Sequence, residues 1–519
     1  MFETRKIITG YFYKSQVVMS NAYIKIPNSI SFNSIVKKDY TLSSSQYMDL
    51  IMPNENFLFV KDFLKRDLQR KDLGVEVGSL NYIGQSTHYF VRTKALQSHS
   101  FLPEITTETA LPIMPNSFVK MNLKQGDLLI SKDSNIGEIV ILDKDYPNFM
   151  LSGAIYKLPV VEKKYYLLAF IKHNIFREQL DFIVPKGATI RHAKTMFLDC
   201  KIPMPNKDAE NVINFVEVLT QAIINKEKLI KERHEAILKS IETELLENQK
   251  PNKFSFELPR INELEEIGRL DTSLYSKAFK ELNFKVKNYK HGSNDLISRG
   301  FTWSRGTSLE KNFIGIRVDS DKYEKGFYEL ALPTNISQFG FLDKSIYIGT
   351  PTKLKTISQG DIIFGGEGFG KGRTYVVVEN SNNVATNYHG IRIINTNENL
   401  TESIFIRCFL AFWREKGMID YIGVGGSGGH CAPSYFHLIE TPLFEEAKQK
   451  EIAILYHNAK IDFKADTFTL ANFLAKDNEY NQQAGIYELD KTAKQLKEIL
   501  NQTIDNIVND NEIKIKFTN

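Results

Sequence analysis

The segment Gln125-Gly-Asp-Leu-Leu-Ile-Ser recurs later in the chain as Gln359-Gly-Asp-Ile-Ile-Phe-Gly. Each copy is followed by a turn that contains glycine and then by a run rich in β-branched residues, at 135–142 and 370–378. This order is typical of a strand, a turn and a second strand. Because the two copies share residues and order, the sequence predicts an internal duplication.

The parallel continues downstream of both copies. An amphipathic pattern predicts a helix, a glycine loop follows it, and a Phe and a Pro come next at the same separation in each copy. In copy one these features are 165–180, 185–192, Phe197 and Pro203, and in copy two they are 403–421, 425–431, Phe436 and Pro442. Four features in one order strengthen the prediction of a duplication.

A long helix is expected after the first copy. Residues 206–248 contain no Pro or Gly, and Pro251 ends the pattern. Such a helix is roughly 60 Å long at 1.5 Å per residue. An apolar stripe with heptad-like spacing runs along it, since charged residues fill the intervals. The stripe consists of Leu219, Ile223, Ile230, Ile237 and Ile241.

A second helical region is expected after the second copy. Residues 443–463 are predicted to be helical, 476–485 to form a polar break, and the last segment to carry another apolar seam. That seam is Leu489, Ala493, Leu496, Leu500, Ile504 and Ile507. The simplest partner for each stripe is the other, in an antiparallel coiled coil. The alternative is that each helix packs on its own domain.

The predicted fold class is α+β. Two tandem α/β domains are each followed by a long helix, and the two helices pair as an antiparallel coiled coil. The expected domains are 1–205, the central helical region 206–250, the second domain 251–442 and the C-terminal helical region 443–519. A length of 519 residues, 42% of them hydrophobic, is sufficient for several folded domains.

The duplicated motifs resemble those of the specificity (S) subunit of type I restriction-modification systems, and the domains resemble its target recognition domains. The likeness extends over almost the whole chain. The residues that carry it are Lys124-Gln-Gly-Asp-Leu-Leu-Ile-Ser-Lys-Asp, Ile136-Gly, Lys186-Gly-Ala-Thr, Cys200-Lys-Ile-Pro-Met-Pro, Arg269-Leu-Asp-Thr-Ser-Leu-Tyr, Ser358-Gln-Gly-Asp-Ile-Ile-Phe-Gly and Gly368-Phe-Gly. Copy two departs from the pattern at Thr441-Pro-Leu-Phe-Glu, where a second Pro is missing.

The resemblance implies a role in DNA recognition. Each domain would read one half of a split site in double-stranded DNA, and the helices would fix the distance between the halves. Two modification (M) subunits would carry S-adenosylmethionine and the methyltransferase chemistry. A restriction (R) subunit would use ATP and Mg. This chain would hold no cofactor and would not be an enzyme by itself.

Composition limits the other classes of function. Lys plus Arg number 66 and Asp plus Glu 62, so a net charge of +4 excludes DNA binding through bulk positive charge. Three widely spaced cysteines argue against a disulfide framework. No apolar stretch is long enough to predict a membrane span, and no signal sequence is evident, so a cytoplasmic location is expected.

The residues also argue against catalysis. The chain contains no Pro-Pro pair, which the base clamp of an amino-methyltransferase would need. The run 365–372 approximates a phosphate loop but ends in Gly372 where Ser or Thr should bind Mg²⁺. His430 and Cys431 lack further ligands nearby, so no metal site is expected.

Candidate DNA contacts are basic and polar residues near the glycine turns, because phosphates and base edges are bound by such side chains. Trp303 is expected in the core, with base stacking as the alternative. The candidates in copy one are Lys132, Ser134, Asn135, Lys186, Thr189, Arg191, His192 and Lys194, and those in copy two are Arg299, Arg305, Lys371, Arg373, Asn387, His389, Ser427 and His430.

Two alternative functions stay open. The chain could be the reader of another methylation-linked phage-defence system, which would keep the fold and change the assembly. It could also be a coiled-coil scaffold that does not bind DNA. The sequence does not give the recognised bases or the spacer length.

Overall fold

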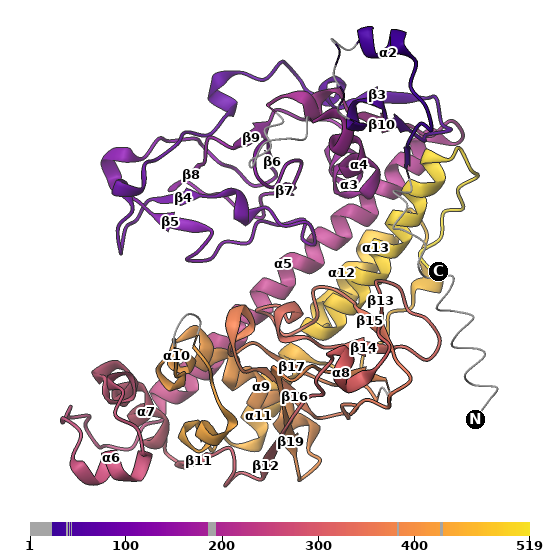
Figure 1. The fold of residues 1–519 in the computed structure, drawn as a ribbon. Coiled ribbons are helices and arrows are strands. Elements are labelled where there is room, and N and C mark those ends of the chain that lie inside the picture. Colours follow the sequence, from indigo (N-terminus) through magenta and orange to yellow (C-terminus); the bar gives the residue numbers. More distant parts are fainter. Residues whose placement is uncertain are drawn as a thin grey trace. The chain divides into compact units, whose positions relative to one another are not determined.

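The computed structural model describes residues 23–37, 40, 42, 44–184, 194–380, 383–425 and 429–518 (Figure 1). They form two compact units. The first-repeat unit holds the described residues of Val17–Leu229, Asp462–Gln482 and Lys491–Asn519, and the second-repeat unit holds those of Ile230–Ile461 and Gln483–Asp490. Both predicted helical regions are therefore divided between the units.

Short strands form four sheets in the first-repeat unit. All pairs are antiparallel except β4 with β8. The sheets, in spatial order, are β7 (Ile139–Ile141), β6 (Leu128–Ser131) and β9 (Ile155–Leu158); β5 (Ala110–Pro112), β4 (Tyr89–Val91) and β8 (Phe149–Leu151); β3 (Phe57–Phe59) and β10 (Lys201–Pro203); and β1 (Ile24–Lys25) and β2 (Asp49–Leu50).

The second-repeat unit has the same pattern. Strand β16 lies between β17 and β19 as β6 lies between β7 and β9, and β14 pairs in parallel with β18 as β4 does with β8. The strand order around β6 therefore recurs around β16, as the repeated motifs predict. The sheets are β12 (Phe301–Arg305), β19 (Gly390–Asn395), β16 (Ile362–Gly365) and β17 (Thr374–Val376); β13 (Val318–Ser320), β15 (Tyr347–Gly349), β14 (Tyr328–Leu330) and β18 (Val384–Ala385); and β11 (Ser293–Asp295) and β20 (Glu440–Pro442).

The helices differ in part from the sequence predictions. The helix expected at 206–248 is confirmed as α5, whereas the break expected at 476–485 is wrong, because α12 occupies most of it. The helices are α2 (Phe32–Lys37), α3 (Lys164–Lys172), α4 (Asn174–Ile183), α5 (Ala209–Glu247), α6 (Ile261–Ile267), α7 (Lys277–Lys287), α8 (Lys311–Ile314), α9 (Leu400–Glu415), α10 (Met418–Ile422), α11 (Glu446–Tyr456), α12 (Phe473–Gln483) and α13 (Ile486–Val508).

The helices expected at 165–180 and 403–421 are each split in two. His173 separates α3 from α4. Its ring accepts a hydrogen bond from the backbone amide of Ile175, so His173 caps the start of α4. Gly417 separates α9 from α10 with φ of +73°, a conformation that favours glycine.

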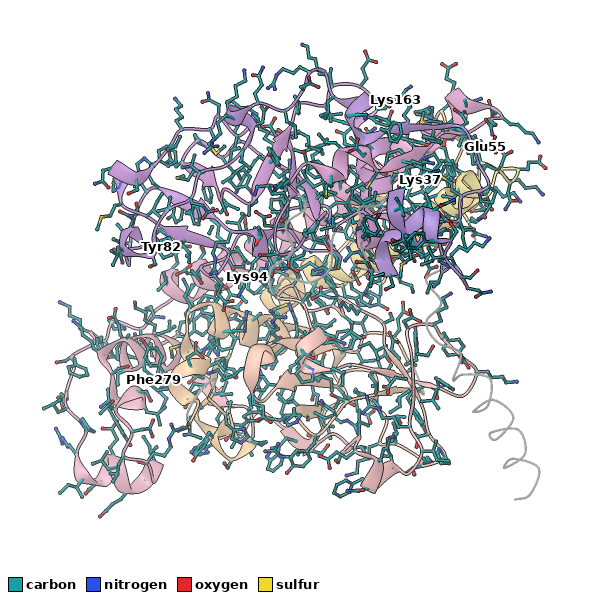
Figure 2. The ribbon with its side chains drawn as sticks, turned by 45° about the horizontal axis from the view of Figure 1, so that its top comes forward. Lys37, Glu55, Tyr82, Lys94, Lys163 and Phe279 are labelled. Carbon is teal, nitrogen blue, oxygen red and sulfur yellow. The ribbon has the colours of Figure 1, made fainter. Side chains whose placement is uncertain are left out.

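Phe279 of α7, labelled in Figure 2, packs edge-on against Trp413 of α9 with 6.4 Å between ring centroids.

The predicted apolar seams are buried along both long helices. In the first-repeat unit, Leu219 and Ile223 of α5 share a core with Leu496 and Leu500 of α13. The contacts Asn206–Asp510 (2.9 Å) and Glu227–Lys497 (2.8 Å) show that these two segments run antiparallel. Pairing of the helices along their whole length as a coiled coil stays a prediction.

The Gln-Gly-Asp motif makes the same turn in both units. Gly126 and Gly360 each have φ of +85°, a conformation that a side chain would strain. The backbone amide of Gly126 donates to the carbonyl oxygen of Leu142, directly after β7, and that of Gly360 donates to the carbonyl oxygen of Val377, directly after β17. Both bonds are 2.8 Å long. The motif therefore recurs because the backbone of this turn requires glycine.

The aspartate of the motif closes the turn. Its carboxylate accepts a hydrogen bond from the backbone amide three residues earlier. It also forms an ion pair with a cation on the neighbouring strand, β9 or β19. The contacts are Asp127 with the Lys124 amide (2.8 Å) and Lys157 Nζ (3.0 Å), and Asp361 with the Ser358 amide (2.6 Å) and Arg392 Nε (2.6 Å). One carboxylate thus joins the turn to the sheet in each unit.

Asp361→Ala should destabilise the second-repeat unit by about 2 kcal/mol, because it leaves Arg392 and a backbone amide without their partner in a part-buried place. Asp127→Ala should cost about 1 kcal/mol or less, because its ion pair is more exposed. Urea unfolding of both variants measures the difference. Equal losses of unfolding free energy in the two variants would contradict the prediction that the more buried Asp361 contributes more stability.

A buried polar cluster joins α5 to α12 within the first-repeat unit. Lys226 Nζ lies 2.6 Å from Asp477 Oδ1 and donates to Asn481 Oδ1 at 2.6 Å. None of the Lys226 side chain is exposed, and burial lowers its pKa. The rings of Phe463 and Tyr480 flank the ammonium, each with its centroid at 5.1 Å. These contacts explain why a polar sequence forms a packed helix here.

Lys226→Met alone should cost about 3–5 kcal/mol, because Asp477 would keep a buried charge without a counterion. The double variant Lys226→Met/Asp477→Leu should recover at least half of that loss, since no charge is then left unpaired. Urea unfolding followed by circular dichroism measures both. A double variant as unstable as the single one would show that the pair does not act as a unit.

Candidate nucleic-acid interface

Four segments of the second-repeat unit meet beyond the end of β16. We call the described residues of 305–307, 365–373, 386–390 and 424–431 the loop edge. Backbone bonds join them: Gly366 N donates to His389 O (3.1 Å), Cys431 N to Gly366 O (2.8 Å), and Gly306 N to Gly390 O (3.1 Å). The sheet therefore fixes where these loops present their side chains.

Glycine is required where β12 leads into the loop edge. A Cβ on Gly306 would lie 2.2 Å from the carbonyl oxygen of Asn387. The first-repeat unit has the same close approach, because a Cβ on Gly74 would lie 2.1 Å from the carbonyl oxygen of Ser152. Each unit thus has a glycine that allows two backbone segments to lie very close together.

An aromatic and basic group lies at the end of β12. The Arg305 guanidinium is 4.6 Å from the Tyr388 ring centroid and donates to the Tyr388 carbonyl at 3.4 Å. Trp303, two residues earlier on β12, is 44% exposed, and Tyr388 is 50% exposed. The expectation that Trp303 lies in the core is therefore wrong. Exposed aromatic rings beside a cation can stack on bases.

Three other predicted contacts are held by the protein itself. Lys371 pairs with Asp420 at 2.7 Å, Arg373 donates to the Ile336 carbonyl at 2.7 Å, and Asn387 Oδ1 accepts the Gly390 amide at 3.1 Å. Arg373 and Asn387 are half-buried. These side chains shape the loop edge, and their contact with DNA stays a prediction.

Two histidines flank one carboxylate on the loop edge. His389 Nδ1 is hydrogen-bonded to Glu367 Oε1, and His430 Nδ1 lies 3.9 Å from Glu367 Oε2. The side chains are 58% (His389), 37% (His430) and 38% (Glu367) exposed. The sequence analysis named both histidines and missed Glu367, because backbone pairing between distant segments brings these three residues together.

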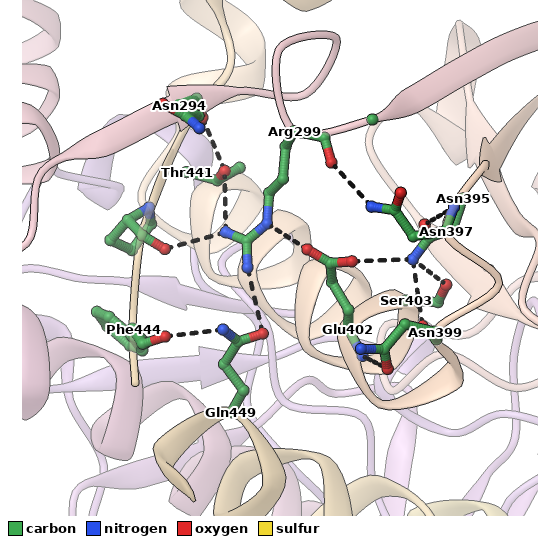
Figure 3. A network of polar contacts seen from close by, with 12 residues as sticks. Asn294, Arg299, Asn395, Asn397, Asn399, Glu402, Ser403, Thr441, Phe444 and Gln449 are labelled. Carbon is green, nitrogen blue, oxygen red and sulfur yellow. Dashed lines mark hydrogen bonds and ion pairs between the residues drawn. The ribbon is translucent and has the colours of Figure 1, made fainter. Parts of the chain in front are cut away.

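Arg299 does not fit its predicted role. Its side chain is 5% exposed and is bound on all sides within the second-repeat unit (Figure 3). It pairs with Glu402 at 2.8 Å and reaches the Pro442 carbonyl (3.1 Å) and Gln449 (3.2 Å). The prediction that Arg299 contacts DNA is wrong, because this guanidinium joins the start of β12 to α9 and α11.

The first-repeat candidates that the structure describes lie at or near two turns. Ser134 and Asn135 are exposed between β6 and β7, and Ser134 has φ of +62°. Lys132 is half-buried and pairs with Asp133. Lys194 is exposed. The remaining candidates fall outside the described residues: Lys186, Thr189, Arg191, His192 and, in the second copy, Ser427.

Buried charges anchor the β6–β7 turn from behind. Glu138 Oε1 accepts a hydrogen bond from Arg177 at 2.6 Å, and Glu138 Oε2 lies 3.8 Å from Lys172 Nζ. Lys172 also donates to the Gln97 carbonyl at 2.6 Å. Burial lowers the pKa of Lys172 to about 7, although Glu138 and Glu227 act in the opposite direction. This lysine thus couples the turn to the core of the unit.

The three cysteines, Cys200, Cys408 and Cys431, are fully buried and unpaired. Burial raises the pKa of each thiol, to about 12 for Cys431. Among the described residues, no group of three or more His, Cys, Asp or Glu side chains is arranged to hold a metal ion. In the same part of the chain, no helix is sufficiently long and apolar to span a membrane.

No family model matches the chain, and no curated protein sequence matches it significantly. Solved structures similar to it include S subunits of type I restriction-modification systems. The S subunit from M. genitalium is 11% identical, with 87% of this chain and 95% of that chain covered and a TM-score of 0.40. The HsdS subunit from Thermoanaerobacter tengcongensis is 10% identical, with 88% and 96% covered and a TM-score of 0.23.

A third similar structure is described as the structural basis of complex assembly and conformational transition of the type I R-M system. It is 10% identical, with 88% of this chain and 98% of that chain covered and a TM-score of 0.26.

The buried Lys172 predicts a pH dependence of stability. Between the folded pKa of about 7 and the unfolded pKa of about 10.4, the unfolded chain binds a proton that the folded chain does not. Stability from this group therefore rises with pH in that window. From pH 7 to pH 9 the free energy of unfolding should rise by about 2 kcal/mol more in the wild type than in Lys172→Met. Urea unfolding at both pH values measures this, and parallel changes would contradict it.

Proposed function

We propose that the chain is the DNA sequence-specificity subunit of a type I restriction-modification complex and is not catalytic by itself. The observation that carries this proposal is the duplicated module. Each unit repeats the same strand order around β6 or β16, and each leads from that sheet into exposed polar loops. Two similar modules in one chain suit a DNA site made of two half-sites.

The loop edge supports contact with DNA. It presents exposed Tyr388 beside Arg305, together with His389 and His430, and exposed Trp303 lies next to it on β12. Aromatic rings, cations and backbone amides are the groups with which proteins bind phosphates and bases. With a net charge of only +4, the isolated chain should bind DNA modestly, and partner subunits would add phosphate contacts.

The long helices would connect the two readers. In this proposal α5 and α13 pair as an antiparallel coiled coil, and their register sets the unspecified spacer between the half-sites. The duplicated surfaces would bind two M subunits, which hold S-adenosylmethionine. An R subunit would add translocation and cleavage with ATP and Mg. The complex would act in the cytoplasm.

Methylome sequencing of a host that expresses this chain with its neighbouring methyltransferase gene tests the proposal. The expected result is a split methylated motif, with two short specified blocks around an unspecified gap. Arg305→Ala should reduce modification at least tenfold, because that cation supports the exposed aromatic group. Arg317→Ala removes a half-buried cation of the same unit that lies outside the loop edge and pairs with Asp319, and it is the matched control.

A methylome with no motif, or with one compact motif that persists without this chain, would reject the proposal and favour a scaffold that does not bind DNA. A split motif in a host that lacks a restriction gene would favour the reader of another methylation-linked defence system.

A further inference from the structure

Glu367 is an exposed carboxylate at the centre of the loop edge. Strand β16 lies between β17 and β19 and ends at Gly365, so Glu367 stands two residues beyond an inner strand of the sheet. A short 3-10 turn begins directly after it at Gly368. A Cβ built on Gly368 would meet no other atom within 4 Å, so the turn that follows Glu367 is open on that side.

The backbone holds this position firmly. Glu367 forms an antiparallel bridge with His430, and the preceding residue, Gly366, bonds to both His389 and Cys431. The direction of the Glu367 side chain is therefore set by chain segments on both sides. Base reading requires this kind of fixed placement, because a side chain on a mobile loop would have to be ordered on binding.

The carboxylate keeps capacity to accept further hydrogen bonds. A carboxylate has about four lone-pair sites on its two oxygens. Oε1 bonds to His389, and His430 Nδ1 lies 3.9 Å from Oε2, which is beyond hydrogen-bond distance. The oxygen that faces His430 thus has room for a stronger donor.

Charge makes a phosphate-binding role unsuitable for Glu367. A carboxylate repels phosphates that lie within the Debye length of about 8 Å. The neighbouring cations Arg305 and Lys371 would suffice for a surface that only binds the backbone of DNA. A glutamate is instead suited to the amino groups of the major groove, which are hydrogen-bond donors.

We propose that Glu367 is a sequence-reading residue that accepts a hydrogen bond from the amino group of cytosine or adenine in one half-site. His389 and His430 are positioning residues that hold the carboxylate toward the groove. The inference rests on the proposed function and adds to it the chemical group that the second repeat recognises.

The first repeat offers a comparison at the equivalent position. Asp133 lies two residues beyond the end of β6, as Glu367 does beyond β16. Its side chain is only 13% exposed and pairs with Lys132. The inference is therefore confined to Glu367, and Asp133→Asn is a control that should leave the block read by the second repeat unchanged.

Methylome sequencing of Glu367→Ala and Glu367→Gln tests the inference. Glu367→Ala should reduce discrimination at least tenfold at one base of one block, and leave the other block unchanged. Glu367→Gln separates the two amino groups, because Gln pairs with adenine through both its oxygen and its nitrogen. A cytosine position should shift toward adenine in that variant, and an adenine position should be retained.

The controls separate base reading from a structural role. Glu415→Ala removes an exposed acid on α9 of the same unit and should leave the motif unchanged. His389→Ala should weaken discrimination at the same base less than Glu367→Ala does, because His389 only positions the carboxylate. Thermal unfolding of purified protein checks that both Glu367 variants fold like the wild type.

An unchanged motif in folded Glu367→Ala would overturn the inference. Equal loss of modification at all sites would also overturn it. Should Glu367→Ala not fold, the motif of Glu367→Gln decides in the same way. A wild-type chain that gives no split motif would instead reject the proposed function itself, so the two failures are distinguishable.

Discussion

One aspartate in each unit joins a turn to a sheet, and the rest of the module depends on that junction. Asp127 and Asp361 each bind the amide that opens the turn and the cation of the neighbouring strand. The glycine before each aspartate places the chain so that β6 or β16 can begin. Without this junction the start of the inner strand and the loops beyond its end would be held less firmly.

The same junction carries different chemistry in the two units. Beyond β6 the acid Asp133 is mostly buried with Lys132, and Glu138 is held by buried Lys172 and by Arg177. Beyond β16 the acid Glu367 is exposed between two histidines. A duplicated frame with unlike loop residues is what two readers of different half-sites would need, because the frame sets position and the loops set chemistry.

The sequence predicted the duplication, the long helix α5 and the buried stripes, since these depend on local spacing and on residues that only one conformation suits. It failed where partners distant in the chain decide. A polar stretch became α12 because Lys226 neutralises Asp477 inside the unit, and Arg299 was misjudged because three distant segments surround its guanidinium. Trp303 was wrongly expected in the core, because its exposure depends on how the strands pair. Glu367 was missed, because its neighbours in the fold are distant in the sequence.

The three buried cysteines have a practical consequence. Their thiols are unexposed and their pKa values are raised, so they carry little of the reactive thiolate. Maleimide dyes applied to the native protein should bypass them. A cysteine placed at an exposed position such as Ser134 or Glu415 would then be labelled selectively. Two introduced cysteines could therefore carry a dye pair without removal of the native ones. Fluorescence energy transfer between the dyes could follow the separation of the two repeats in solution.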